Sequence, residues 1–256
     1  LVVWKDHYYI WDNLTETIFC FDAKGKYVRR LYQQGNGPKE YVQITDFDID
    51  RSNGDICIYS NRSQSVCIYT AEGEFKIKYN VPFLLSTLTK QDTLVHYYLG
   101  RLPNTHFYKA SFPEQYRFLT ANLSNEPVNE ELYYKFDDTH LQVPNGSIHF
   151  SYYKDTLLLT EYLSPKVYTV SSDGSLNPRY RIRFTTNTYS PSFEAPLDLD
   201  IMNNATTEGG LAVLYSPIFE TDDYIFFNYA WGLVGIGCVY KPTSEIRNLG
   251  YFIDDD

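Results

Sequence analysis

The residues with the clearest chemical potential are three aspartates in the run Asp-Phe-Asp-Ile-Asp, at Asp46, Asp48 and Asp50. Alternate side chains of a β-strand point to the same face, so a strand here would gather three carboxylates. Such a set could hold Ca²⁺ or another divalent cation. The pattern fails as an EF-hand loop, because Arg51 stands where glycine is required and Cys57 where a bidentate glutamate belongs. A metal site is therefore one hypothesis, and solvated or hydrogen-bonded strand-end aspartates are the alternative.

The glycine-rich stretch Gly35-Asn36-Gly37-Pro38 raises the question of a phosphate-binding loop. Such loops lie between a strand and a helix, and their backbone N–H groups hold the phosphate. Here Pro38 removes one N–H donor, no Lys-Ser/Thr pair follows, and the chain resumes as a strand pattern over residues 42–50. The stretch therefore predicts a corner between strands, and no cofactor is expected beyond the possible divalent ion.

Glu40 and Tyr41 lie on this corner and are the candidate ligand-binding residues. A carboxylate and a phenol at this position could bind a ligand at the mouth of a central channel. The alternative is structural, with Glu40 capping backbone donors of the glycine turn and Tyr41 packing between blades.

Other chemistry has less support in the sequence. The five histidines lack HxxxH or HExxH spacing, and no GxSxG motif is present, so no catalytic residue is assigned. The four cysteines show no CxxC pair. Cys57 and Cys67 flank a short hairpin, where they could form a cross-strand disulfide or remain buried thiols.

Composition excludes several partner classes. The net charge is -10, from 32 acidic and 22 basic residues, which argues against nucleic acid. No apolar run approaches the ~20 residues of a membrane span. The first residues form a strand pattern rather than a signal peptide, so we expect a chain from which a leader has been removed. The 25 tyrosines and 16 phenylalanines favour β-sheet, and exposed ones could stack on sugars.

An internal repeat organises the chain. The segment 10–27 aligns without a gap on residues 58–75, so that Asn13 matches Asn61 and Gly25 matches Gly73. Further copies begin near Leu159 and Tyr224, and a fifth unit is expected over Thr93–Phe112. Four-stranded sheets that repeat every ~40–50 residues are typical of propeller blades.

The repeat therefore predicts an all-β fold, a β-propeller of four-stranded antiparallel sheets that forms a single domain over residues 1–256. Asp46 to Asp50 is the predicted innermost strand of the second blade. Two stretches, Pro113–Leu141 and Thr185–Gly210, break the rhythm and are predicted to be long loops or short helical insertions.

The run Gly35 to Tyr41, between Phe21–Tyr27 and Asp46–Asp50, resembles a family of Bacteroides-type cell-envelope proteins of unknown function. This resemblance is specific over Tyr8–Lys78. The family consists of TolB-like β-propellers related to the NHL-repeat group, and it implies six blades. It also implies export to the periplasm or outer-membrane surface, with a secretory or lipoprotein leader. The sixth blade would be shared between Thr185–Gly210 and the ends of the chain, which puts closure of the ring in question.

The sequence thus favours a monomeric, non-catalytic envelope propeller that binds a carbohydrate or protein partner. A metal-dependent propeller hydrolase or lactonase, with channel carboxylates as ligands, is the alternative.

Overall fold

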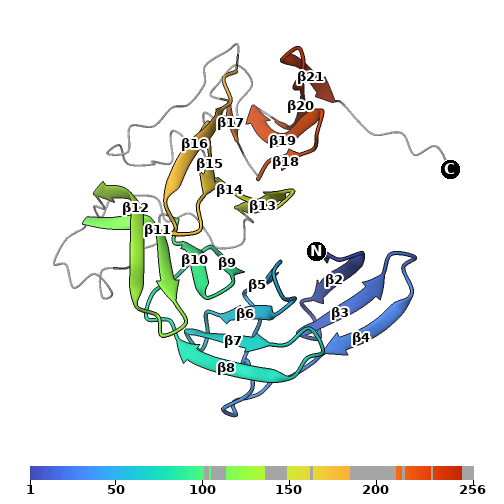
Figure 1. Cartoon of the computed structure of the whole chain (residues 1–256), viewed down its shortest axis with the longest axis vertical. Helices are drawn as coiled ribbons and strands as arrows, with labels where there is room; N and C mark the ends of the chain where they lie inside the picture. The colour runs from blue at the N-terminus through green and yellow to red at the C-terminus, as the bar shows by residue number, and fades with distance from the viewer. Residues whose placement is uncertain are drawn as a thin grey trace.

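The computed structural model describes residues 1–100, 104, 114–135, 149–161, 164–184, 212–214, 217–231 and 233–249. In these ranges the strands form five antiparallel sheets, which follow one another around a common centre (Figure 1). The predicted all-β propeller architecture is therefore confirmed. Among the described residues there is no apolar helix of membrane-spanning length.

Each sheet is one blade, and its strands follow the chain from the centre outward. Blade one contains β1 (Val2–Trp4), β2 (His7–Asp12), β3 (Thr17–Asp22) and β4 (Tyr27–Leu31). Blade two contains β5 (Asp46–Ile49), β6 (Ile56–Ser60), β7 (Ser65–Tyr69) and β8 (Phe75–Asn80). Blade three contains β9 (Thr87–Gln91), β10 (Leu94–Tyr98), β11 (Glu114–Asn122) and β12 (Pro127–Lys135).

Blade four contains β13 (Phe150–Tyr153), β14 (Thr156–Thr160), β15 (Lys166–Val170) and β16 (Leu176–Arg181). Blade five contains β17 (Val213–Leu214), β18 (Phe219–Glu220), β19 (Tyr224–Trp231), β20 (Leu233–Tyr240) and β21 (Glu245–Leu249). In blade five both β17 and β18 pair with β19.

The repeat seen in the sequence corresponds to a repeated local geometry. The turn between the third and fourth strands of blades one, two and four has a glycine with positive φ, at Gly25 (74°), Gly73 (91°) and Gly174 (86°). Only glycine adopts this conformation readily. The strand before each of these turns carries a register shift against the fourth strand, as expected for a bulge that accompanies such a turn.

Four apolar clusters hold neighbouring blades together. One cluster lies between blades one and two, one between two and three, one between three and four, and one between four and five. Blade two lies inside the arc and packs through both faces, so all residues of β6 and β7 are buried. We call each of these contacts between adjacent blades a seam.

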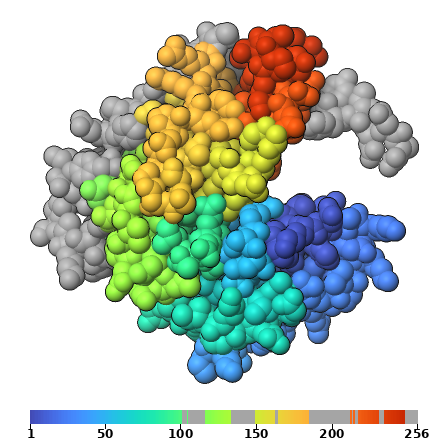
Figure 2. All heavy atoms as spheres, in the orientation of Figure 1, coloured from blue at the N-terminus to red at the C-terminus, as the bar shows by residue number. Residues whose placement is uncertain are grey.

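The arc of described blades is open between blade one, in blue, and blade five, in orange-red (Figure 2). The face of blade one turned away from blade two exposes Val3, Tyr8 and Ile10, and strand pairing places all three on the same side. The equivalent face of blade five exposes Phe219, Tyr224 and Val234. We call these surfaces the end faces.

The described residues form five blades, so the predicted count of six is wrong. The five repeat copies visible in the sequence correspond to the five blades, whereas the sixth blade rested on the resemblance alone. The segment assigned to it, Thr185–Gly210, lies outside the described residues.

For Pro113–Leu141, the prediction of a long loop or short helical insertion is wrong over the described residues 114–135, which form the antiparallel strands β11 and β12. The acidic residues of this stretch suggested a loop, but Glu130 and Glu131 lie on the outermost strand of blade three. Residues 113 and 136–141 lie outside the described residues. Of the fifth repeat unit, predicted over Thr93–Phe112, the structure contains β10, and residues 105–112 lie outside the described residues.

The disulfide alternative for Cys57 and Cys67 does not fit the structure. Cys57 packs in the cluster between blades two and three, whereas Cys67 packs in the cluster between blades one and two. The two thiols therefore lie on opposite faces of one sheet. Both are free and buried, as are Cys20 and Cys238.

Candidate functional site

The aspartates at positions 46 and 48 lie on β5, and both accept hydrogen bonds from β9 of the neighbouring blade. Asp46 Oδ2 accepts from Thr87 Oγ1 at 2.7 Å and from the backbone N of Leu88 at 2.8 Å. Asp48 Oδ2 accepts from Thr89 Oγ1. The predicted common face of β5 is therefore directed at blade three.

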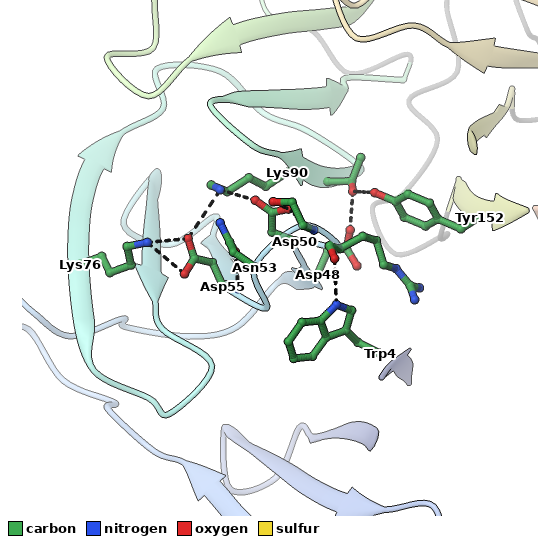
Figure 3. Close-up of polar contacts among 11 residues, drawn as sticks. Trp4, Asp48, Asp50, Asn53, Asp55, Lys76, Lys90 and Tyr152 are labelled. Atoms are coloured by element: carbon green, nitrogen blue, oxygen red, sulfur yellow. Dashed lines mark hydrogen bonds and ion pairs between the residues drawn. The ribbon is translucent and has the colours of Figure 1, made fainter. Parts of the chain in front are cut away.

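Asp50, at the end of β5, belongs to a buried ion-pair network (Figure 3). It pairs with Lys90 of β9, and the two side chains are only 1% and 3% exposed. Lys90 also lies 3.6 Å from Asp55, which forms a second pair at 2.8 Å with Lys76 of β8. Asp50 Oδ1 further accepts from the N and Oγ of Ser52, at 2.9 and 2.7 Å. Two carboxylates are thus held by two lysines, of which only Lys90 is buried.

Burial dominates the electrostatics of the first two aspartates. Desolvation raises the pKa of Asp46 to about 7, although the hydrogen bonds from Leu88 and Thr87 oppose the shift. Desolvation likewise raises the pKa of Asp48 to about 6, against the hydrogen bond from Thr89. Both side chains remain partly accessible to solvent. Near neutral pH they can therefore exchange protons, which is a property that general acids and bases share.

A tyrosine and an arginine extend the network to blade four (Figure 3). The hydroxyls of Tyr152 on β13 and Thr89 lie 3.1 Å apart, and Thr89 donates its own proton to Asp48, so Tyr152 is the donor of this pair. The guanidinium of Arg51 lies 4.6 Å from the centre of the Tyr152 ring. Arg51 Nη1 also donates to the backbone O of Val3. One residue of the turn after β5 therefore contacts blades one and four.

Trp4 of blade one packs against the turn that follows β5. Its Nε1 donates to the backbone O of Arg51 at 3.0 Å, and its ring packs against Gly54. A Cβ at position 54 would lie 2.3 Å from the Trp4 ring, and Gly54 has φ of +86°. Glycine is therefore required at this position by both space and backbone conformation.

Of the three predicted metal ligands, Asp46 and Asp48 lie on β5 and Asp50 follows it directly, and each has a separate partner on β9. Within the residues that the structure describes, no three His, Cys, Asp or Glu side chains form a group that could hold a metal ion. A cation at Asp46, Asp48 and Asp50 stays a prediction, which the titration described below tests.

Glu40 and Tyr41 have structural contacts of the kind that the second interpretation described. Glu40 Oε2 accepts from the backbone N of Gly37 at 2.7 Å, and a Cβ at Gly35 would lie 2.0 Å from the same oxygen. Tyr41 is fully buried, and its hydroxyl donates to the backbone O of Glu16 at 2.7 Å. The carboxylate therefore fills the concave side of the glycine turn, where a phosphate would lie in a binding loop. Ligand contact at either residue stays a prediction.

Another buried carboxylate, that of Glu220 on β18, lies in the seam between blades four and five. It accepts from Arg179 Nε and Nη2 at 3.0 and 2.9 Å, from Tyr180 at 2.8 Å and from Lys241 at 2.9 Å. Desolvation would raise the pKa of Glu220, but the bonds from Arg179, Lys241 and Tyr180 together hold it below its ordinary value.

Sequence reasoning did not identify the partners on β9, on β13 and in the turn after β5. The signal that could have found them is Thr87-Leu88-Thr89-Lys90, a polar pattern in an inner strand of a propeller. The first four residues of this strand are all buried, and a buried lysine requires an acidic partner. The matching spacing of Asp46, Asp48 and Asp50 one blade earlier supplies that partner.

Comparisons with known proteins give the chain a family and a fold but no activity. No curated protein matches it. A predicted exported protein of Bacteroides fragilis NCTC 9343 has a similar structure, with a TM-score of 0.75 and 17% identity, over 96% of this chain and 69% of that one. A member of the DUF4221 family from Bacteroides vulgatus ATCC 8482 has a TM-score of 0.55 and 12% identity, over 91% of this chain and 74% of that one.

At these identities the likeness shows the propeller fold alone. The sequence itself matches the family model "Domain of unknown function (DUF4934)" over residues 1–255. That match spans nearly the whole chain, and the protein therefore belongs to the DUF4934 family.

Proposed function

We propose that this protein is a non-catalytic binding propeller of the bacterial cell envelope, which acts as a monomer and binds a carbohydrate or protein partner through its loops. The observation that carries the proposal is that the carboxylates on and directly after β5 already have hydrogen-bond or ion-pair partners within the protein. Asp46, Asp48 and Asp50 each bond to a residue of β9, so they join two blades instead of presenting three free ligands.

Export is supported by similarity alone. The Bacteroides fragilis protein that shares the fold, with a TM-score of 0.75, is described as an exported protein. Fractionation of cells that express the protein from its own gene, with detection in periplasmic and outer-membrane fractions, tests this part of the proposal.

The competing function is metal-dependent hydrolysis at the same aspartates. One observation favours it, because Asp46 and Asp48 are partly accessible and have pKa values of about 7 and 6. Carboxyl groups that titrate near neutral pH in an accessible site are candidates for acid–base or ligand roles.

Titration with Ca²⁺ and Zn²⁺ by calorimetry distinguishes the two functions. The binding proposal expects no saturable uptake of either ion and no hydrolysis of lactone or ester substrates. Asp48→Asn is the matched variant, because it keeps an acceptor for Thr89 and removes the charge. Saturable binding that Asp48→Asn abolishes, together with metal-dependent turnover, would replace the binding proposal with the hydrolase.

A further inference from the structure

Two Asn-Gly pairs lie in the described part of the chain, at Asn36-Gly37 and Asn53-Gly54. In such a pair the backbone N of the glycine can attack the side-chain amide of the asparagine, because glycine has no Cβ that hinders the approach. The product is a cyclic succinimide, which water opens to aspartate or isoaspartate. The structure places the two pairs in opposite environments, so their rates of reaction should differ.

The pair Asn53-Gly54 is held at both reacting groups. Oδ1 of Asn53 accepts from the backbone N of Asp55 at 2.8 Å. The backbone N of Gly54, which would be the nucleophile, donates to the backbone O of Asp50 at 2.9 Å or less, at 2.8 Å. Gly54 is also buried against the Trp4 ring. Attack on the amide carbon requires these contacts to open, so the folded protein protects Asn53.

The asparagine of the other pair has no such restraint. Asn36 is exposed, and it forms no hydrogen bond with any residue that the structure describes. The connection that contains it, residues 32–45, projects as a blue loop at the rim of the arc, next to β8 (Figure 1). Lys78 Nζ anchors this loop through the backbone O of Glu40, at 2.7 Å, and of Gly37, at 3.3 Å. The side-chain amide of Asn36 is therefore open to a nucleophile and to water.

The nitrogen that would attack Asn36 is also in contact with a base. The backbone N of Gly37 donates to Glu40 Oε2 at 2.7 Å. A carboxylate in this position can take up the N–H proton as the nitrogen attacks, and a positioned general base accelerates such a step by about 100-fold or more. The corresponding N–H of Gly54 is bonded to a backbone carbonyl, which cannot take up the proton.

We propose that Asn36 is a site of spontaneous deamidation in the folded protein, with Glu40 as the general base. The proton of Gly37 N passes to the Glu40 carboxylate while the nitrogen forms a bond to Cγ of Asn36. The Cγ–Nδ2 bond then breaks, and Nδ2 leaves as ammonia with the proton that Glu40 held. Water adds to a succinimide carbonyl and gives aspartate or isoaspartate at position 36. This modification goes beyond the proposed binding function and does not depend on it.

The test follows both asparagines in one sample of the whole protein. Tryptic cleavage places them in separate peptides, residues 31–39 and 52–62. After incubation at neutral pH, mass spectrometry of the two peptides measures the conversion of each amide to the acid over time. We expect Asn36 to convert about tenfold or more faster than Asn53. In urea, where both pairs lose their contacts, the two rates should become similar.

Glu40→Gln is the matched variant, because the amide keeps an oxygen acceptor for the Gly37 N–H but cannot take up its proton. It should slow the conversion of Asn36 by about tenfold or more and leave the rate at Asn53 unchanged. Equal or faster conversion of Asn36 in this variant would overturn the role of Glu40. The wild-type contrast does not depend on the variant: conversion of Asn36 no faster than that of Asn53 in the folded protein would overturn the site, and a contrast that persists in urea would overturn its structural explanation.

Discussion

The seam between blades two and three and the seam between blades four and five both contain carboxylates, but the pKa values of these groups shift in opposite directions. Asp46 and Asp48 receive hydrogen bonds from hydroxyl and amide donors, and their pKa values are raised to about 7 and 6. Glu220 receives bonds from Arg179, Lys241 and Tyr180, and its pKa is lowered. Desolvation therefore dominates at Asp46 and Asp48, whereas at Glu220 the bonds from two cations and a phenol outweigh it.

The largest expected effect comes from removing Lys90, a buried cation of the seam between blades two and three. Lys90→Met would leave Asp50 and Asp55 without their shared buried partner, which should lower the free energy of unfolding by about 3–5 kcal/mol. Lys76→Met is the control, because the Lys76 side chain is 45% exposed and its pair with Asp55 should contribute about 0–1 kcal/mol. Urea denaturation measures both. Equal losses in the two variants would show that burial of Lys90 does not determine the strength of the network.

A smaller loss of stability is expected when the carboxylate charge is removed from the seam between blades four and five. Glu220→Gln keeps the shape but removes the anion that Arg179 and Lys241 contact, so the free energy of unfolding at pH 7 should fall by about 1.5–3 kcal/mol. Because the pKa of Glu220 is lowered by folding, its stabilisation exists above its ordinary value of about 4.3 and is lost as pH falls through the folded value. The difference between variant and wild type should therefore shrink toward pH 3. A difference that is constant between pH 3 and pH 7 would contradict this explanation.

The seam between blades two and three should contribute to stability with the reverse dependence on pH. Folding raises the pKa of Asp46 and Asp48, so their ionised forms disfavour the folded state, and stability should fall as pH rises from about 4 through about 7. With a discount for partial exposure, the fall between pH 5 and pH 8 should be about 2 kcal/mol. Thermal melts across this range measure it. Asp46→Asn, which cannot ionise, should flatten the profile; a variant as pH-sensitive as wild type would assign the effect to other groups.

The smallest effect is expected from removing a hydrogen bond between uncharged groups, which serves as a reference for the two carboxylate-containing seams. Tyr41→Phe removes the hydrogen bond from the Tyr41 hydroxyl to the backbone of Glu16 and keeps the buried ring, which should cost about 1 kcal/mol. Burial raises the pKa of Tyr41 to about 12, so the loss should be equal at pH 5 and pH 8. Urea denaturation at the two values checks this, and a loss that varies with pH would mean that Tyr41 is coupled to a titrating neighbour.

The sequence predicted the blades well because their information is local. The copies at residues 10–27 and 58–75 carry the same turn glycine and the same alternation, and both fold as predicted. It also predicted that Asp46, Asp48 and Asp50 share a face. Their partners could not be predicted in the same way, since pairing of Asp50 with Lys90 depends on how two blades pack across forty residues. The blade count failed for a related reason, because no sixth copy of the unit is present in the sequence and only the resemblance implied one.

The open arc of described blades also affects the order in which the blades unfold. Blades two, three and four each have two seams, whereas blades one and five have one seam each among the described residues, and an end face in place of the other. In a stack where stability comes from contacts between neighbours, the terminal units open first. Backbone amides should therefore exchange with deuterium fastest in blades one and five and slowest in β6 and β7. The connection between β4 and β5, residues 32–45, spans this gradient, because it joins a terminal blade to the most protected one.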